Sequence, residues 1–87
     1  MRWLYILQCA DNSLYIGETA DLDLRLLQHQ DGSACSYTAR RRPVALVYSE
    51  RHDSREAALR RERQLKGWTR AKKDALIAGD MRRLKSL

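Results

Sequence analysis

The feature that most constrains the fold is a nearly continuous apolar run near the N-terminus, from Trp3 to Cys9. Its aromatic and branched residues favour a β-strand, and the lack of alternation predicts a strand covered on both faces. A polar cluster, Asp11-Asn12-Ser13, follows as a turn, and the apolar pattern resumes from Leu14 to Gly17. Two such strands joined by a short turn predict an antiparallel hairpin.

The remaining pattern predicts three helices and a third strand, enough for a small antiparallel sheet. Asp31-Gly32-Ser33 ends the first helix, and Pro43 opens the strand. Either Asp53 or Ser54 caps the second helix, and Thr69 caps the third. The expected bounds are a helix over 22–30, a loop over 32–43, a strand over 44–49, a helix from 53 or 54 to 66, and a last helix from about residue 70 to 77. Residues 1–80 are expected to form one domain, and 81–87 a short basic tail, helical or frayed.

The composition is that of one small, basic domain. The chain has 87 residues, a net charge of +6 and a pI near 9.8, which favour a polyanionic partner, most simply nucleic acid, over a protein that is merely basic. Cys9 and Cys35 lie too far apart for a zinc-site spacing and are typical of reduced thiols, Cys9 as a small core residue. No apolar stretch approaches the roughly 18 residues of a membrane span, so we expect a cytoplasmic protein without membrane contact.

The segment most suggestive of function is Tyr15-Ile16-Gly17, followed by Arg25 and His29. Arg25 and His29 are four residues apart on a predicted helix, so they lie on one face. The tyrosine ends the strand that leads into that helix. A phenol, a guanidinium and an imidazole brought together suggest the handling of a phosphate.

A second informative residue is Glu62, which falls on or beside the apolar face of the second helix with Leu59 and Leu65. A carboxylate there either binds a ligand or pairs with an exposed partner, and Lys66 at i+4 is available. The adjoining Trp68 is expected to anchor the last two helices rather than stack on a base. Arg40, Arg41 and Arg42 form either a phosphate-binding loop, with Tyr37 and Thr38 as further contacts, or a solvated charge run.

Together these residues resemble the GIY-YIG nucleases, most closely their small stand-alone bacterial members, which are relatives of the catalytic subunit of a structure-specific endonuclease. The second half of the name motif is intact as Tyr15-Ile16-Gly17, whereas Trp3-Leu4-Tyr5 keeps only the tyrosine of the first half. The likeness also includes the spacing from Arg25 to His29. It extends over residues 3–78. Pro43-Val44 and Val47-Tyr48 resemble the third strand of the family, the run from Glu56 to Trp68 resembles its glutamate helix, and Arg70, Lys72 and Lys73 resemble its closing helix.

The resemblance implies an α/β (α+β) sandwich around a three-stranded antiparallel sheet, and DNA phosphodiester hydrolysis with one divalent metal ion, Mg²⁺ or Mn²⁺. Glu62 would ligate the metal and Arg25 would stabilise charge on the scissile phosphate. Tyr5 and Tyr15 would position or deprotonate the attacking water, and His29 would assist proton transfer or hold a phosphate. Branched, nicked or single-stranded substrates, a role in DNA repair, and a monomer or weak dimer are the corresponding expectations.

Two alternatives to an autonomous enzyme stay open. One is a nucleic-acid-binding module with little catalysis, acting through Arg40 to Arg42 and the basic residues of the last helix. The other is a nuclease subunit that is active only with a partner protein. Glu18, which follows the glycine of the motif, is either a second acid near the metal or a surface residue, and we favour a surface residue.

Overall fold

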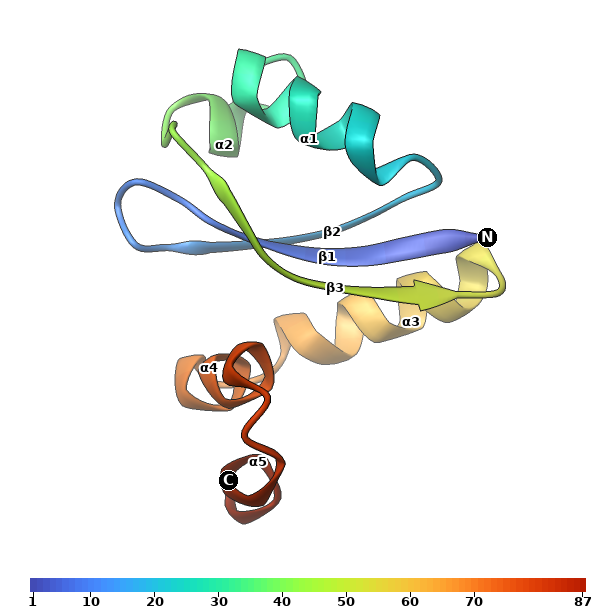
Figure 1. Cartoon of the computed structure of the whole chain (residues 1–87), viewed down its shortest axis with the longest axis vertical. Coiled ribbons are helices and arrows are strands. Elements are labelled where there is room, and N and C mark those ends of the chain that lie inside the picture. Colours follow the sequence, from blue (N-terminus) through green and yellow to red (C-terminus); the bar gives the residue numbers. More distant parts are fainter.

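The computed structural model describes residues 1–87 as a three-stranded sheet with helices on both faces (Figure 1). The strands are β1 (Arg2–Gln8), β2 (Leu14–Thr19) and β3 (Ala45–His52), in the order β2-β1-β3. Both pairings are antiparallel. The most apolar strand is therefore central, and the predicted α+β class with a three-stranded antiparallel sheet is confirmed.

The five helices divide between the two faces of this sheet. Helices α1 (Leu22–Asp31) and α2 (Ser36–Ala39) lie on one side, α3 (Arg55–Lys66) crosses the other, and α4 (Arg70–Ala78) and α5 (Met81–Ser86) lie beyond α3 (Figure 1). Side chains cap the three long helices, because Asp21, Ser54 and Thr69 each accept a hydrogen bond from a backbone amide of the first turn. The sequence allows either Asp53 or Ser54 as the N-cap of α3, and the structure shows Ser54.

Alternation along β1 builds a separate apolar cluster on each face. Leu4 and Ile6 pack with Ile16 of β2 and with Leu65 and Leu76 of α3 and α4. The other face carries Tyr5, Leu7, Cys9 and Val44, covered by apolar residues of α1. The strand from Trp3 onwards is thus covered on both faces, as its continuous apolar pattern predicts. Its tyrosine lies on the side of α1.

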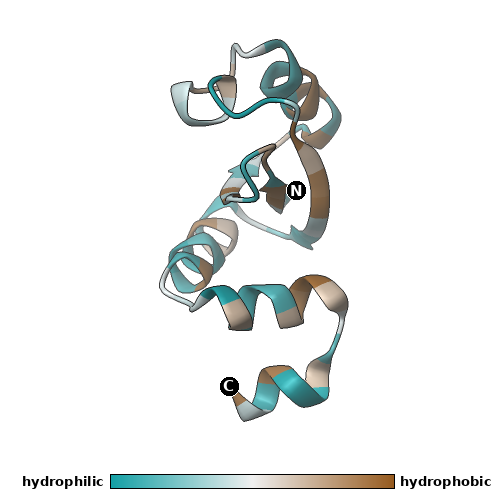
Figure 2. Cartoon of the chain, turned by 90° about the vertical axis from the view of Figure 1, so that its left-hand side faces the viewer, coloured by the Kyte–Doolittle hydropathy of each residue, from teal (hydrophilic) through white to brown (hydrophobic).

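The largest differences from the predicted bounds concern the loop before Pro43 and the ends of β2 and β3. Residues 36–39 of the expected loop form α2, where the amide of Ala39 bonds the carbonyl of Cys35 and closes a helical turn. Strand β2 continues past Gly17 to Thr19, and β3 begins at Ala45 and continues to His52. The tail, expected to be helical or frayed, is helical. Asp80 caps α5, Leu84 packs against the core, and the other residues of α5 are largely hydrophilic (Figure 2). Trp68 also packs against the core, as expected for an anchor.

Candidate active site at the edge of the sheet

The first part of the site is set by the pairing of β1 with the edge strand β2. Tyr5 lies directly opposite Gly17, and Leu7 lies opposite Tyr15. The Tyr5 ring folds over Gly17 so closely that a Cβ atom at Gly17 would lie 2.6 Å from the Tyr5 hydroxyl. Tyr5 is completely buried, whereas Tyr15 is half-buried. The two phenols are therefore not equivalent, and Tyr15 is the one that solvent reaches.

A buried hydrogen-bond chain lies behind Tyr5. The Tyr5 hydroxyl is 2.8 Å from His29 Nε2, and His29 Nδ1 is 2.8 Å from Thr38 Oγ1. Thr38 Oγ1 in turn lies 3.4 Å from the Cys35 sulfur. His29 and Thr38 are completely buried, and this burial leaves them no surface on which to hold a phosphate or contact nucleic acid. Burial therefore favours a supporting role for both side chains, and the expected part of His29 in proton transfer stays a prediction.

Arg25 lies one helical turn before His29 on α1, and its guanidinium has no acidic partner. Its positive charge acts on Tyr5, Tyr15 and His29, so the predicted shared face of Arg25 and His29 is directed at the tyrosines. Arg25 is half-buried and open to solvent. An unpaired guanidinium at such a position is suited to bind an anion.

Glu62 approaches the same edge from α3, on the opposite side of the sheet. Its side chain is only 18% exposed and lies 3.3 Å from Lys66 Nζ, so the predicted i,i+4 pair is present. Its carboxylate also lies near enough to Tyr15 to raise the pKa of that phenol. Glu62 is therefore more than a surface partner of Lys66, because its charge also acts on the half-buried Tyr15.

The pKa values of both phenols are raised. Burial raises the pKa of Tyr15 to about 12, with the charges of Cys35 and Glu62 adding to the effect and Arg25 opposing it. Burial likewise raises the pKa of Tyr5, again against the lowering effect of Arg25. Both tyrosines are therefore neutral near pH 7, and each is a hydrogen-bond donor rather than a free base.

The imidazole of His29 is expected to stay neutral when the protein is folded. Burial and the charge of Arg25 lower its pKa from the ordinary 6.5, so the unfolded chain binds the proton more readily. This contribution to the free energy of unfolding is full above pH 6.5 and declines as the pH falls towards the folded pKa. We expect denaturant unfolding to report lower stability at about pH 5.5 than at 7.5. An NMR titration placing the pKa of His29 at or above 6.5 would contradict this assignment.

The donor set at Glu62 fits a hard divalent cation only in part. No group of three or more His, Cys, Asp or Glu side chains lies together in the structure. A cation at Glu62 would therefore take its remaining ligands from water and from phosphate oxygens. Mg²⁺ is commonly held in this way, by one or two carboxylates and a phosphate, with several waters retained.

The arginines of the basic loop are mostly engaged within the protein. Arg41 Nε is 3.0 Å from Asp11 Oδ2, and its guanidinium lies 3.9 Å from the centre of the Tyr37 ring. Arg42 donates to the carbonyls of Ala39 and Gln30. Arg40 is exposed and its guanidinium has no partner. Arg41 and Arg42 therefore stabilise the loop itself, and the expected phosphate binding by this loop stays a prediction.

Tyr37 connects this loop with the site. Its ring is exposed and lies 5.9 Å from the Tyr15 ring, centre to centre, with the planes tilted by 32°. An exposed aromatic ring beside a half-exposed phenol can stack against a base or sugar. Of the predicted nucleic-acid contacts, Tyr37 and Arg40 therefore have the most suitable positions.

The basic residues of α4 lie on the other side of the sheet (Figure 1). Arg70 pairs with Asp74 at 3.0 Å and donates to the carbonyl of Asn12 at 2.7 Å. Lys72 lies over the Trp68 ring at 4.7 Å, and Lys73 is half-buried. Arg70 and Arg41 thus bind the turn between β1 and β2 from two sides, which brings positive charge to the end of the sheet where β2 begins.

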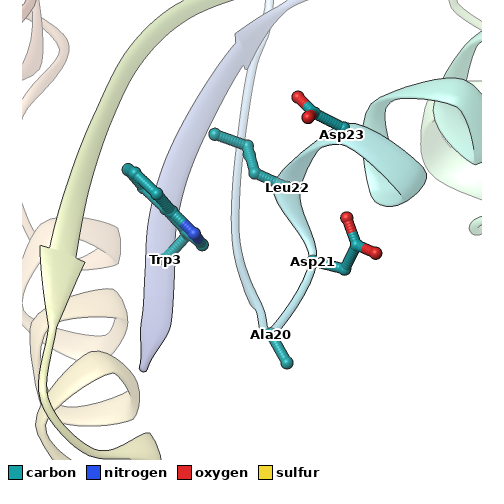
Figure 3. Close-up of a pocket in the computed structure, with 5 residues that line it drawn as sticks. All are labelled: Trp3, Ala20, Asp21, Leu22 and Asp23. Atoms are coloured by element: carbon teal, nitrogen blue, oxygen red, sulfur yellow. The ribbon is translucent and has the colours of Figure 1, made fainter.

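The pocket in Figure 3 lies apart from these residues. It is lined by Trp3, Leu22 and the start of α1, and Leu22 points towards the Trp3 indole while the carboxylates of Asp21 and Asp23 lie on the helix side (Figure 3). None of the predicted site residues lines it. An open edge, rather than a closed pocket, is where the candidate residues meet, as expected for a site that accepts a long polymer.

Two residues have roles that the sequence did not reveal. Glu18, favoured as a surface residue, has a side chain only 9% exposed and pairs with Arg2 at 2.9 Å and with Arg55 at 3.8 Å. These ion pairs link β2 to β1 and to α3, and the Glu18 carboxylate is engaged with the two arginines. Cys35 is the N-cap residue of α2, and Thr38 is the third residue of that helix. Side chains at these two positions often contact each other, so this spacing is the sequence signal that predicts the contact of Cys35 with Thr38.

Comparison with known proteins identifies a family and relatives for this chain. The family described as "GIY-YIG catalytic domain" matches residues 1–74. A UPF0213 protein of Natronomonas pharaonis is 44% identical over 79 residues, covering 91% of this chain and 93% of the relative. A UPF0213 protein of Bacillus pumilus is 47% identical over 76 residues, covering 87% and 78%.

A solved structure supports the same relationship. The solution NMR structure of a UPF0213 protein of Bacillus halodurans has a TM-score of 0.59 and 39% identity, covering 90% of this chain and 84% of that chain. No helix in the present structure has the length and apolar character needed to cross a membrane. The chain belongs to the GIY-YIG family, a group of nuclease-type domains, and is similar to its small UPF0213 members.

Proposed function

We propose that this chain is an endonuclease that hydrolyses DNA phosphodiester bonds with one Mg²⁺ or Mn²⁺ ion, acting on branched, nicked or single-stranded structures. The observation that carries the proposal is that two opposite charges lie near the half-buried phenol of Tyr15. Glu62 from α3 and Arg25 from α1 approach Tyr15 from the two sides of the sheet, and both influence its pKa. A phosphodiester placed there would meet a cationic donor and a carboxylate at once.

Each residue has a distinct part in this proposal. The Arg25 guanidinium donates hydrogen bonds to non-bridging oxygens of the scissile phosphate and stabilises the charge that develops on them. The Tyr15 hydroxyl orients the attacking water. Glu62 holds the divalent ion, which when bound polarises a phosphoryl oxygen and makes its water more acidic. Tyr5 and His29, being buried, position these groups instead of touching the substrate.

The test is cleavage of a labelled panel containing duplex, nicked, flap, branched and single-stranded DNA, together with RNA. Each substrate is incubated with Mg²⁺, Mn²⁺ or EDTA. We expect metal-dependent cleavage of at least one discontinuous or single-stranded DNA. Salt-sensitive binding without cleavage would favour the nucleic-acid-binding module, and cleavage that appears only with an added cell extract would favour the partner-dependent subunit.

We expect Arg25→Ala to reduce the single-turnover rate of cleavage by about 100-fold, as the loss of one preorganised donor to a developing charge commonly does. The matched control is Arg60→Ala, which removes an exposed guanidinium from α3 and the same net charge. Circular dichroism verifies that both variants fold. Equal rates for the two variants would show that Arg25 contributes only general positive charge.

A further inference from the structure

The hydrogen-bond chain behind Tyr5 has a direction that its distances and donor inventory determine. Tyr5, His29 and Thr38 are completely buried, so each polar hydrogen among them needs an acceptor within the chain. A neutral imidazole carries one hydrogen, and each hydroxyl carries one. The question is which ring nitrogen of His29 carries the proton.

At the Tyr5 end of this hydrogen-bond chain, the available acceptors indicate which nitrogen of His29 is unprotonated. The only neutral acceptor within hydrogen-bond distance of the Tyr5 hydroxyl is His29 Nε2, at 2.8 Å. If Nε2 carried the proton, the Tyr5 hydrogen would be buried without an acceptor. The other neighbour of this hydroxyl is Arg25, whose guanidinium donates and never accepts. Tyr5 is therefore the donor and Nε2 the acceptor.

The opposite end gives the same direction. With Nε2 as acceptor, His29 carries its proton on Nδ1 and donates to Thr38 Oγ1 at 2.8 Å. The Thr38 hydrogen then has the Cys35 sulfur as its acceptor, at 3.4 Å. The hydrogens of Tyr5, His29 and Thr38 then each have an acceptor, and the donors point one way from Tyr5 through His29 and Thr38 to Cys35.

We propose that Thr38 is a positioning residue of the active site. Its hydroxyl oxygen accepts a hydrogen bond from His29 Nδ1 and so fixes the tautomer of the imidazole. In that tautomer Nε2 accepts the hydrogen of the Tyr5 hydroxyl, and the Tyr5 oxygen is left facing Arg25. This inference rests on the proposed function for its catalytic consequence. The proposal also explains why a completely buried threonine lies at the third position of the short helix α2. The loop that contains α2 is thereby coupled to Arg25, the residue that meets the phosphate.

The first arm of the test is the tautomer of His29 in the full-length wild-type protein, read from the nitrogen shifts and nitrogen–proton couplings of ¹⁵N-labelled imidazole. The chain has only two histidines, so His52→Gln assigns the spectrum. We expect the proton on Nδ1. A proton on Nε2 would overturn the proposal, whether or not the protein cleaves DNA. A correct tautomer in a protein that cleaves nothing would instead count against the proposed function and leave the assignment standing.

The second arm compares Thr38→Val, which keeps the shape but not the hydroxyl, with Thr38→Ser, which keeps the hydroxyl. We expect Thr38→Val to alter the His29 spectrum and to lower kcat by about 10- to 100-fold with KM unchanged, the usual effect of removing a residue that orients a catalytic group. Thr38→Ser restores most of kcat. Ser36→Ala removes an exposed hydroxyl from the same helix and serves as the control. A folded Thr38→Val protein with the wild-type tautomer and kcat would overturn the proposal. If Thr38→Val does not fold, the proposal is judged by the His29 tautomer of the wild type and by the kcat of Thr38→Ser.

Discussion

Replacing Glu62 by Gln is expected to abolish metal-dependent cleavage while the protein still folds and still binds DNA. Glutamine keeps the shape of the side chain but loses the charge that a hard cation needs. We expect the single-turnover rate to fall by at least about 100-fold, the scale seen when one electrostatic stabiliser is removed. The fold tolerates the change because the pair with Lys66 is a partly exposed i,i+4 pair at 3.3 Å, whose contribution to stability is small.

Two further readouts distinguish this result from general damage. DNA affinity should be equal to or slightly higher than that of the wild type, because a negative charge is removed beside a polyanion. The pKa of Tyr15 should fall, since Glu62 is one of the groups that raise it. Glu56→Gln is the matched control, because it neutralises an exposed carboxylate in the first turn of the same helix. Full activity in Glu62→Gln would remove the metal assignment.

Replacing Gly17 by Ala is expected to cause a large loss of stability, because an added methyl group would overlap the Tyr5 side chain. The new Cβ atom would lie 2.6 Å from the Tyr5 hydroxyl oxygen and 2.7 Å from the ring carbon that bears it. Tyr5 cannot move aside freely, because it is completely buried and bonded to His29. Overpacking of this kind costs about 1–3 kcal/mol. Urea denaturation of the two proteins measures the difference.

The control for this prediction is Gly67→Ala. At Gly67 the nearest atom to an added Cβ is a carbonyl oxygen at 3.5 Å, an ordinary contact, and φ is −82°. Its stability should change by about 0.5 kcal/mol or less, or rise slightly, because alanine restricts the unfolded chain. If Gly17→Ala were as stable as Gly67→Ala, the close approach of Tyr5 to β2 would be incorrect.

The parts of the fold that depend on local pattern were predictable from the sequence. The unbroken apolar run from Trp3 required cover on both faces, which places its strand at the centre of the sheet. Thr69 caps α4, and the polar turn before Leu14 separates β1 from β2, both as the sequence predicts. The i,i+4 spacing of Arg25 and His29 predicted one shared face, and both act on the tyrosines.

The parts that depend on long-range packing were not predictable. The side of the sheet that a tyrosine occupies is set by register, and register is decided by pairing between distant segments. Burial of His29 and Thr38 depends on how α1 and α2 meet, which no spacing in one segment encodes. The ion pairs of Glu18 could not be predicted, because its two arginine partners, Arg2 and Arg55, are far from it in the sequence.

The most direct measurement compares wild type, Glu62→Gln, Arg25→Ala, Glu56→Gln and Arg60→Ala on the most susceptible DNA of the panel, all purified in parallel and assayed with Mg²⁺ and with EDTA. The account predicts that the two control variants cleave at the wild-type rate, that the two site variants lose at least about 99% of it, and that EDTA stops all cleavage. Equal rates for all five proteins would contradict it, because the cleavage would then come from another part of the chain or from a contaminating nuclease.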